Sequence, residues 1–340
     1  MIFSYIFILG LSYIILLLLN KFFYNHKLLI YKNYLPHKDK FKNIVLSGGS
    51  YFLITLTCFV TYISFMDLNY VLLFSPFIFY LVGLLSDSDF KISPVERLLI
   101  IFFTSIFIFI LLDIKINKIN IEIIDKIIAN KIVNIIFCSS CLTVLINGGN
   151  FIDGKHGNFL LYYILVFLFL GFYLSSKYFY VVIIIIPFLI NNFNEKNFLG
   201  DNGSYYFSSI IGLLLIYLQN KLNLNPFVVA NILAYPTYEC LFSYLRRFFN
   251  KKKTYKPDKK HLHHLVHVMI KKKFIYQKRW SNTYTSFFLF SLNSIHFIFI
   301  WIYMDNTIVL KKIFFLYFFI YIFIYYFIKF YLFKNFKNFY

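Results

Sequence analysis

The sequence is poor in charged residues and poorest in acidic ones. Only 14% of its 340 residues are charged, against about 25% in a soluble globular domain. Hydrophobic residues make up 60% of the chain and the mean hydropathy is +0.70. This composition excludes a cytosolic enzyme, a disordered protein, a collagen and a small disulfide scaffold.

Cysteine is scarce as well. The four cysteines are Cys58, Cys138, Cys141 and Cys240. Cys138 and Cys141 form a C-x-x-C pair inside an apolar stretch, but no second pair and no histidines follow at the spacing of a zinc site. The pattern therefore predicts inert, buried thiols rather than a metal centre.

The sequence contains many long runs of apolar residues. A membrane helix needs about 20 mostly apolar residues, and the runs lack the alternation of a β-barrel strand. Eleven runs approach this length, near 2–20, 48–66, 68–85, 98–112, 132–146, 159–174, 178–190, 205–218, 226–245, 283–303 and 308–328. The sequence predicts an all-α, polytopic membrane protein with about eleven transmembrane helices, forming one integral membrane domain over 1–340.

The basic residues are unevenly distributed between the connecting loops. Lys and Arg number 34 against 14 Asp and Glu, a net charge of +20. Loops on one side of the eleven runs hold most of the basic residues, above all the loop 246–282. Because basic loops stay in the cytoplasm, we expect the N-terminus outside and the C-terminus inside. The same bias explains the positive charge without nucleic acid as a partner.

The first run lacks a basic leading segment and a cleavage site, so we expect a retained helix.

Ionisable residues inside the apolar runs are almost absent. Glu239 and His296 are the exceptions, with Lys311 and Lys312 near an outer end. Ion-coupled transporters place such groups near the membrane midplane, so this pattern argues against one. Polar clusters lie instead in four loops on the cytoplasmic side, within 83–97, 147–158, 197–204 and 257–264.

Each cluster alone is an ordinary turn between helices. Together they supply what a diphosphate substrate needs. Carboxylates can hold Mg²⁺, glycine turns let backbone amides approach phosphate, and Lys and His donate hydrogen bonds to its oxygens.

The residues of these loops, and the order of the loops along the chain, resemble the motifs of the polyprenyl-phosphate N-acetylhexosamine-1-phosphate transferases. This is the WecA-like branch of the glycosyltransferase family 4 superfamily, which also contains the MraY translocases. Family members show G-L-x-[DE]-D-x-x-x-x-x-S-P, N-x-x-N-F-x-D-G-x-x-G, F-x-G-D-x-G-S and, after an Arg pair, P-D-x-x-H-x-H-H. Here these correspond to 83–94, 147–157, 198–204, and Arg246-Arg247 followed by 257–264. The motif-bearing part is about 36–267, and the runs ten and eleven, 283–328, follow it.

The resemblance implies an enzyme of the inner (plasma) membrane with its active site on the cytoplasmic face. It would transfer a sugar 1-phosphate from a UDP-N-acetylhexosamine to polyprenyl (undecaprenyl) phosphate and release UMP. That reaction would start an O-antigen-like cell-surface polysaccharide, as in lipopolysaccharide synthesis. The implied cofactor is Mg²⁺, with Mn²⁺ as an alternative, and a homodimer is one option for the assembly.

The resemblance also assigns roles to particular residues. Asp201 matches a catalytic position that ligates the metal. Asp87 matches a catalytic position assigned in the family either to metal binding or to activation of the lipid phosphate, and we favour the metal role. Substrate-binding positions are matched by Lys91, Asn147, Asn150, Asp153, His261, His263 and His264. Lys155 is a further basic residue in the second motif.

Three departures from the family pattern stand out. Ser86 occupies the place of an Asp or Glu, His156 replaces an Asp or Asn, and Leu46-Ser47 replace a Pro-Arg pair before the glycines. Two alternatives therefore stay open. One is a catalytically degenerate relative that binds lipid phosphate without turnover, and the other is a lipid or solute transporter whose loops are only turns.

Overall fold

The computed structural model describes residues 2–35, 40–62, 74–88, 92–154, 156–251, 260–273 and 280–335. The chain folds into two compact units, each made of two chain segments. Unit 1 comprises Met1–Thr104 and Phe159–Leu213, and unit 2 comprises Ser105–Asn158 and Leu214–Tyr340. The single domain expected from the sequence stays a prediction.

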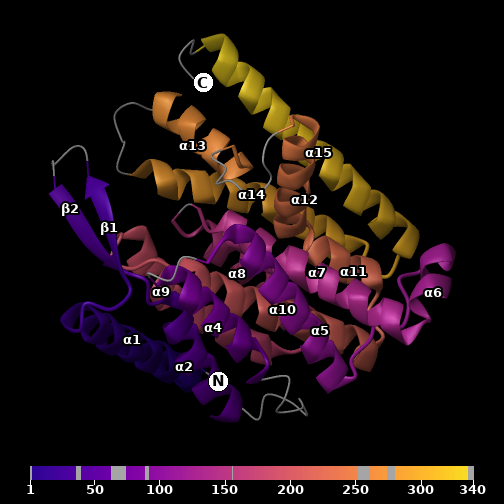
Figure 1. Cartoon of the computed structure of the whole chain (residues 1–340), viewed down its shortest axis with the longest axis horizontal. Helices are drawn as coiled ribbons and strands as arrows, with labels where there is room; N and C mark the ends of the chain where they lie inside the picture. The colour runs from indigo at the N-terminus through magenta and orange to yellow at the C-terminus, as the bar shows by residue number, and fades with distance from the viewer. Residues whose placement is uncertain are drawn as a thin grey trace. The chain divides into compact units, whose positions relative to one another are not determined.

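Unit 1 is a helical bundle with one small hairpin (Figure 1). Its helix α1 packs along α9 and α2. An aromatic core joins the helices around Phe52, whose ring centroid lies 4.8 Å from that of Phe207 and 5.3 Å from that of Phe188. The helices are α1 (Ile2–Asn25), α2 (Gly48–Tyr62), α4 (Pro76–Asp87), α8 (Asn158–Tyr173), η1 (Ser176–Tyr178) and α9 (Phe179–Phe193), with the first parts of α5 (Pro94–Leu112) and α10 (Gly200–Leu222).

The hairpin was not expected from the hydropathy pattern. Strands β1 (Ile30–Leu35) and β2 (Lys40–Val45) pair antiparallel from Ile30↔Val45 to Leu35↔Lys40. Beyond the hairpin, the backbone N–H of Phe198 donates to the carbonyl oxygen of Val45 at 2.9 Å. The hairpin thus fixes the segment that leads into α10.

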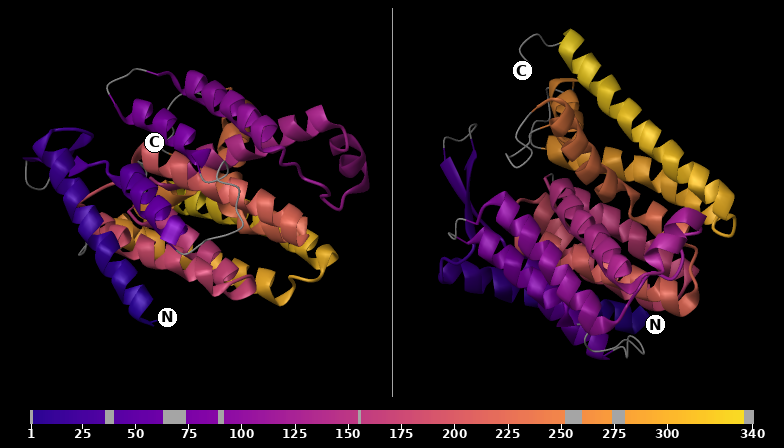
Figure 2. Two further views of the ribbon diagram at one scale, coloured as in Figure 1. Left: turned by 90° about the horizontal axis from the view of Figure 1, so that it is seen from below. Right: turned by 45° about the vertical axis from the view of Figure 1, so that its right-hand side comes forward.

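Unit 2 contains the remaining helices. Helix α7 packs along α12, and α13 packs against α14 and α15. Figure 2 shows α14 and α15 side by side, joined by a short turn. The elements are α6 (Glu122–Ile128), α7 (Lys131–Ile152), α11 (Pro226–Ile232), α12 (Ala234–Phe249), α13 (Leu262–Lys273), α14 (Ser281–Ile302) and α15 (Thr307–Asn335), with the later parts of α5 and α10.

Local sequence explains where several of these helices begin. The Oδ1 atom of Asn130 accepts hydrogen bonds from the backbone N–H groups of Ile132 and Val133, at 2.9 and 3.3 Å, at the start of α7. Asn225 caps α11 in the same way and is followed by Pro226. Asparagine caps satisfy the N–H groups that lack intrahelical partners, and proline is well suited to the first helical position.

Among the described residues, six helices are long and apolar enough to cross a membrane. They are Phe3–Asn25, Pro94–Leu112, Lys131–Ile152, Ser176–Phe193, Ser281–Ile302 and Thr307–Asn335. Three shorter apolar helices are Gly48–Phe59, Pro76–Asp87 and Asn158–Tyr173. The helical membrane class is confirmed, whereas the count of eleven and the sides on which the termini lie stay predictions.

Two expectations from the sequence need correction. The run 226–245 is two helices, α11 and α12, that meet at Leu233. Pro236 lies in the first turn of α12, where its missing N–H is tolerated, but it cannot continue a helix from upstream. All four cysteines are free, yet only Cys138 of the C-x-x-C pair is buried, and Cys141 is exposed.

The close contact of α7 with α12 depends on Gly148. A Cβ atom at this position would lie 2.1 Å from the carbonyl oxygen of Pro236 and 2.7 Å from its carbonyl carbon. Because backbone atoms cannot move aside, we expect Gly148→Ala to force the helices apart and lower the stability by about 1–3 kcal/mol. Thermal unfolding in detergent would show this as a lower Tm.

Gly10 provides the matched control for this substitution. It lies in α1, and nothing lies within 4 Å of a Cβ added there. Because alanine favours helices over glycine by about 1 kcal/mol, Gly10→Ala should leave the Tm unchanged or raise it. Equal Tm values for the two variants would contradict the assigned packing.

Candidate functional site

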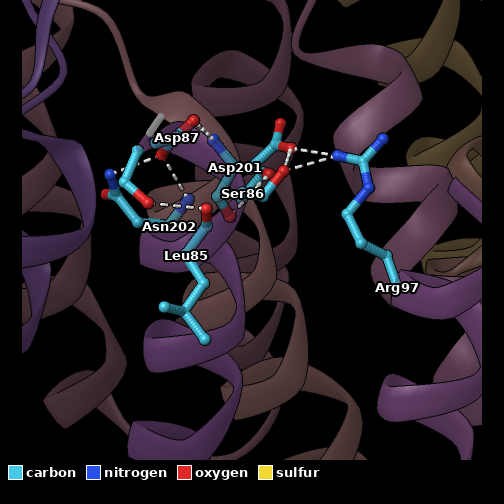
Figure 3. Close-up of polar contacts among 8 residues, drawn as sticks. Leu85, Ser86, Asp87, Arg97, Asp201 and Asn202 are labelled. Atoms are coloured by element: carbon cyan, nitrogen blue, oxygen red, sulfur yellow. Dashed lines mark hydrogen bonds and ion pairs between the residues drawn. The ribbon is translucent and has the colours of Figure 1, made fainter. Parts of the chain in front are cut away.

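Two aspartates that are far apart in the sequence meet in unit 1. Asp87 is the last residue of α4, and Asp201 lies in the first turn of α10 (Figure 3). The Oδ1 atom of Asp87 accepts the backbone N–H of Asp201 at 3.0 Å. Its Oδ2 atom accepts the backbone N–H of Asn202 at 2.9 Å and the side-chain Nδ2 of Asn202 at 2.6 Å. Asp87 therefore caps the start of α10, where N–H groups lack intrahelical partners.

The second carboxylate is held by a hydroxyl and a guanidinium. Oδ2 of Asp201 accepts hydrogen bonds from Ser86 Oγ at 2.5 Å and from Arg97 Nη1 at 2.6 Å. The same Nη1 atom lies 2.5 Å from Ser86 Oγ, to which it donates. The side chains of Arg97 and Asp201 are 25% and 24% exposed. A partly exposed ion pair contributes little stability, so this triangle mainly fixes the direction of the Asp201 carboxylate.

Arg97 and Asn202 are residues for which the sequence predicted no role. Arg97 lies in the first turn of α5 and reaches a residue 104 positions away. Asn202 accepts the backbone N–H of Gly49 at 2.6 Å and thereby connects the start of α2 to the start of α10. The neighbouring motifs were visible in the sequence, but nothing in the local pattern indicated these partners.

The motif glycines serve the close approach of these helices. A Cβ at Gly49 would lie 2.2 Å from Asn202 Oδ1, and one at Gly83 would lie 2.5 Å from Asn202 Cα. Gly200 has φ +76° and would place a Cβ 2.7 Å from Asp87 Oδ2. From the sequence, such glycines were expected to serve the approach of phosphate. That role stays a prediction, and in unit 1 these glycines let α2, α4 and α10 meet around the aspartates.

Burial and the neighbouring Asp201 carboxylate raise the pKa of Asp87 to about 7. The hydrogen bonds from residues 201 and 202 act in the opposite direction, because they stabilise the charged form. Asp87 lies outside the six helices that are long enough to cross a membrane. Near neutral pH its carboxyl group is therefore protonated in part of the molecules.

This raised pKa predicts a pH-dependent stability in the absence of divalent cations. The ordinary pKa of the Asp87 carboxyl is 3.8 and its folded value is about 7. Its stabilising contribution is therefore complete below about pH 4 and is lost as the pH rises through about 7. We expect the Tm in EDTA to fall as the pH rises from about 4 to about 7 and to level off above that, and to fall less in Asp87→Asn, whose side chain cannot ionise. Equal pH dependence in both proteins would contradict the assignment.

The donor set suits a magnesium ion that is shared with a substrate. Mg²⁺ usually takes one or two protein carboxylates together with phosphate oxygens and waters, and Asp87 and Asp201 are such a pair. No group of three His, Cys, Asp or Glu side chains among the described residues could enclose a metal. A cation at this pair would share Oδ2 of Asp201 with Arg97 and Ser86, or displace them.

The three predicted histidines come together in unit 2. His261 directly precedes α13, and His263 and His264 lie in its first turn. The ring centroids of His263 and His264 are 4.1 Å apart, and those of His261 and His263 are 5.6 Å apart. His261 is 6% exposed and His263 is fully buried. The preceding Pro257, Asp258 and Lys259 lie outside the described residues.

The predicted nucleotide-sugar residues lie at the end of α7, also in unit 2. Asn147 and Asn150 are half-buried on this helix, and Asp153 follows its last residue. The next residue is in contact with the histidines, because a Cβ at Gly154 would lie 2.4 Å from His263 Nε2. The structure thus brings the second motif next to the histidine cluster. Lys91 and Lys155 lie outside the described residues.

His156, which departs from the family pattern, has a structural partner through its backbone. Its carbonyl oxygen accepts a hydrogen bond from Ser286 Oγ of α14 at 2.7 Å. This bond uses no imidazole atom, so it fixes the loop after α7 whatever the side chain at this position.

Comparison with known proteins points to one family. Residues 69–219 match the model of glycosyl transferase family 4. Over 80 residues, the chain is 38% identical to the probable undecaprenyl-phosphate N-acetylglucosaminyl 1-phosphate transferase of Bacillus subtilis, covering 23% of this chain and 22% of that protein.

A second relative comes from Thermotoga maritima. It is an undecaprenyl-phosphate alpha-N-acetylglucosaminyl 1-phosphate transferase, 34% identical over 83 residues, covering 24% of this chain and 27% of that protein. The chain thus matches about a quarter of the length of these relatives. The stretch 69–219 contains Asp87, Arg97 and Asp201. Through this stretch, the chain is similar to glycosyl transferase family 4.

Proposed function

We propose that the protein transfers N-acetylhexosamine 1-phosphate from a UDP-sugar to undecaprenyl phosphate and releases UMP. The observation that carries the proposal is the contact of Asp87, Asp201 and Arg97 within the stretch that matches the family. The names of the two relatives support the lipid acceptor and the amino sugar. The product would start an O-antigen-like polysaccharide at the cytoplasmic face of the inner membrane.

The reaction exchanges one phosphoanhydride bond for another. An oxygen of the lipid phosphate attacks the phosphorus that carries the sugar, and a new P–O bond forms. The bond from that phosphorus to the bridging oxygen breaks, and UMP leaves with this oxygen and its electron pair. A phosphate monoester has its second pKa near about 6, so the attacking oxygen is largely deprotonated at neutral pH. The protein therefore has to align two polyanions and neutralise their charge.

The residues of unit 1 suit charge neutralisation. Asp87 and Asp201 would hold Mg²⁺, which supplies positive charge at the phosphate oxygens when it is bound. Arg97 fixes the Asp201 carboxylate through its bond of 2.6 Å, and Ser86 fixes the same oxygen. Asp87 in turn holds the start of α10, on which Asp201 lies.

The residues of unit 2 suit binding of the nucleotide sugar. His264, which is half-buried, would contact the diphosphate directly, with the buried His261 and His263 behind it in the same cluster. Asn147, Asn150 and Asp153 offer amide and carboxylate groups that can hydrogen-bond the nucleoside and the sugar. Lys91 keeps its predicted role as a further phosphate contact.

One observation favours a second candidate, a degenerate relative that binds lipid phosphate without turnover. Ser86 stands in the place of an acid, and its hydroxyl group, together with Arg97, occupies Oδ2 of Asp201. Under this reading the wild-type protein binds the lipid phosphate but releases no UMP. Ser86→Asp would then create activity by restoring the missing carboxylate.

The deciding experiment measures UMP release by the purified protein. It uses undecaprenyl phosphate, Mg²⁺ and a panel of UDP-N-acetylhexosamines, with Mn²⁺ as a second cation. Metal-dependent UMP release with one of the donors supports the transferase. No release from the folded wild-type protein, together with release by Ser86→Asp, supports the degenerate relative and overturns the transferase.

A further inference from the structure

A carboxylate stands behind the histidine cluster in unit 2. Glu239 lies in α12 and is fully buried. Its Oε1 atom accepts hydrogen bonds from His261 Nδ1 at 3.0 Å and from the backbone N–H of Leu262 at 3.1 Å. Its Oε2 atom accepts the hydroxyl of Tyr321, in α15, at 2.9 Å. A buried carboxylate is costly unless it is fully hydrogen-bonded, and these three donors come from two other parts of the fold.

The bond to Leu262 connects Glu239 to the start of α13. Leu262 is the first residue of this helix, so its N–H group has no intrahelical acceptor. A negative charge near a helix N-terminus is also favourable, because it opposes the positive end of the helix dipole. Glu239 thus caps the helix whose first turn carries His263 and His264.

The bond to His261 orients its imidazole ring. With the Nδ1–H group donated to Glu239, Nε2 is the ring atom that can face a ligand. Phe151 and His263 flank the ring, with centroids at 4.9 and 5.6 Å, and the two imidazoles are parallel within 3°. A carboxylate behind an imidazole commonly fixes its tautomer and orientation in this way.

We propose that Glu239 is a positioning residue for the proposed transfer reaction. By holding Nδ1 of His261 and the first N–H of α13, it fixes the histidine cluster whose half-buried member, His264, would meet the diphosphate of the nucleotide sugar. This inference rests on the proposed function and deepens it. In the sequence, Glu239 was visible only as an ionisable residue inside an apolar run.

Kinetics test the proposal first. Glu239→Leu removes the acceptor of all three bonds, those from His261, Leu262 and Tyr321. It should lower kcat/KM about 10- to 100-fold, as losing the partner that orients a histidine does in metal sites. Glu239→Gln keeps an acceptor oxygen and should lose less. Tyr238→Phe is the matched control, because the Tyr238 hydroxyl also donates from α12 to α15, at 2.6 Å to the Phe314 carbonyl, and not to the Glu239 carboxylate. It should retain about wild-type activity.

A double-mutant cycle separates positioning from a general effect on folding. If Glu239 acts through His261, the losses in Glu239→Leu and His261→Ala combine to less than their product. Losses that multiply in full would overturn the proposal. So would a Glu239→Leu variant whose activity equals that of Tyr238→Phe.

Hydrogen exchange gives a readout that does not depend on activity. In Glu239→Leu, the peptide covering 260–273 should exchange faster, whereas peptides within α12 and α15 should keep their protection. Faster exchange throughout α12 and α15, or unchanged exchange in 260–273, would overturn the proposal. If Glu239→Leu does not fold, hydrogen exchange is measured in Glu239→Gln.

Failure of the proposed function is distinguishable from failure of this inference. Absence of UMP release by the wild-type protein contradicts the transferase. Amide hydrogen exchange of the peptide 260–273 in the Glu239 variants then tests by itself whether Glu239 positions the histidines. Release by the wild-type protein with no change in the Glu239 variants contradicts only the positioning role.

Discussion

Replacement of Asp201 by asparagine is expected to lower the rate of UMP release about 100- to 1,000-fold, as does removal of one preorganised electrostatic group from an active site. The substitution keeps the size of the side chain and an oxygen that can accept from Ser86 and Arg97. It removes the negative charge that would hold Mg²⁺ and that pairs with Arg97 at 2.6 Å. We therefore expect the loss to appear in activity with little change in Tm.

Asp113→Asn is the control for this charge change. Asp113 forms an ion pair of 2.9 Å with Lys131, and both side chains are largely exposed, at 77% and 74%. Exposed pairs of this kind contribute little, so UMP release should stay near the wild-type rate. An Asp201→Asn protein that keeps more than about a tenth of the activity would remove Asp201 from the proposed electrostatic role.

Replacement of Asp87 by alanine is expected to damage activity and stability together. It leaves the backbone N–H groups of Asp201 and Asn202, and the Nδ2 group of Asn202, without the acceptor that they share. Each buried donor left unpaired costs about 1–3 kcal/mol. We expect a clear fall in Tm and a loss of UMP release at least as large as that in Asp201→Asn.

The comparison of Tm values distinguishes the two aspartates. A structural cap for α10 should lower the Tm when it is removed, and the fall should be larger for Asp87→Ala than for Asp201→Asn. Both are measured by thermal unfolding in the same detergent, with UMP release assayed alongside. Equal Tm values for wild-type protein and Asp87→Ala would show that Asp87 does not stabilise the start of α10.

Much of the candidate site could be predicted because its residues lie in short motifs. Asp87 and Asp201 were predicted from their match to the family's motifs, and the structure places them in contact. His261, His263 and His264 are nearly consecutive, so a single helix start brings them together. A motif keeps its residue order in the linear sequence, and for this reason the resemblance to the family was sufficient to identify these residues.

The partners of these residues could not be predicted in the same way. Ser86 bonds to Asp201 across 115 positions, and Arg97 reaches it across 104. Glu239 reaches His261 across 22 positions and a break between two helices. Hydropathy and helical periodicity describe one segment at a time, whereas these bonds depend on how separate helices pack.

The sequence by itself determined the class of this protein, the approximate course of its helices and the residues that form its motifs. Apolar length and charge are local properties, so they can be read without a fold. Only the tertiary structure decided that Ser86 donates to Asp201 and that Gly49, Gly83 and Gly200 serve close helix contacts. It also decided that Asp87 and Glu239 each cap a helix to which they do not belong. These features arise from the packing of distant segments, where burial obliges each polar group to find a partner.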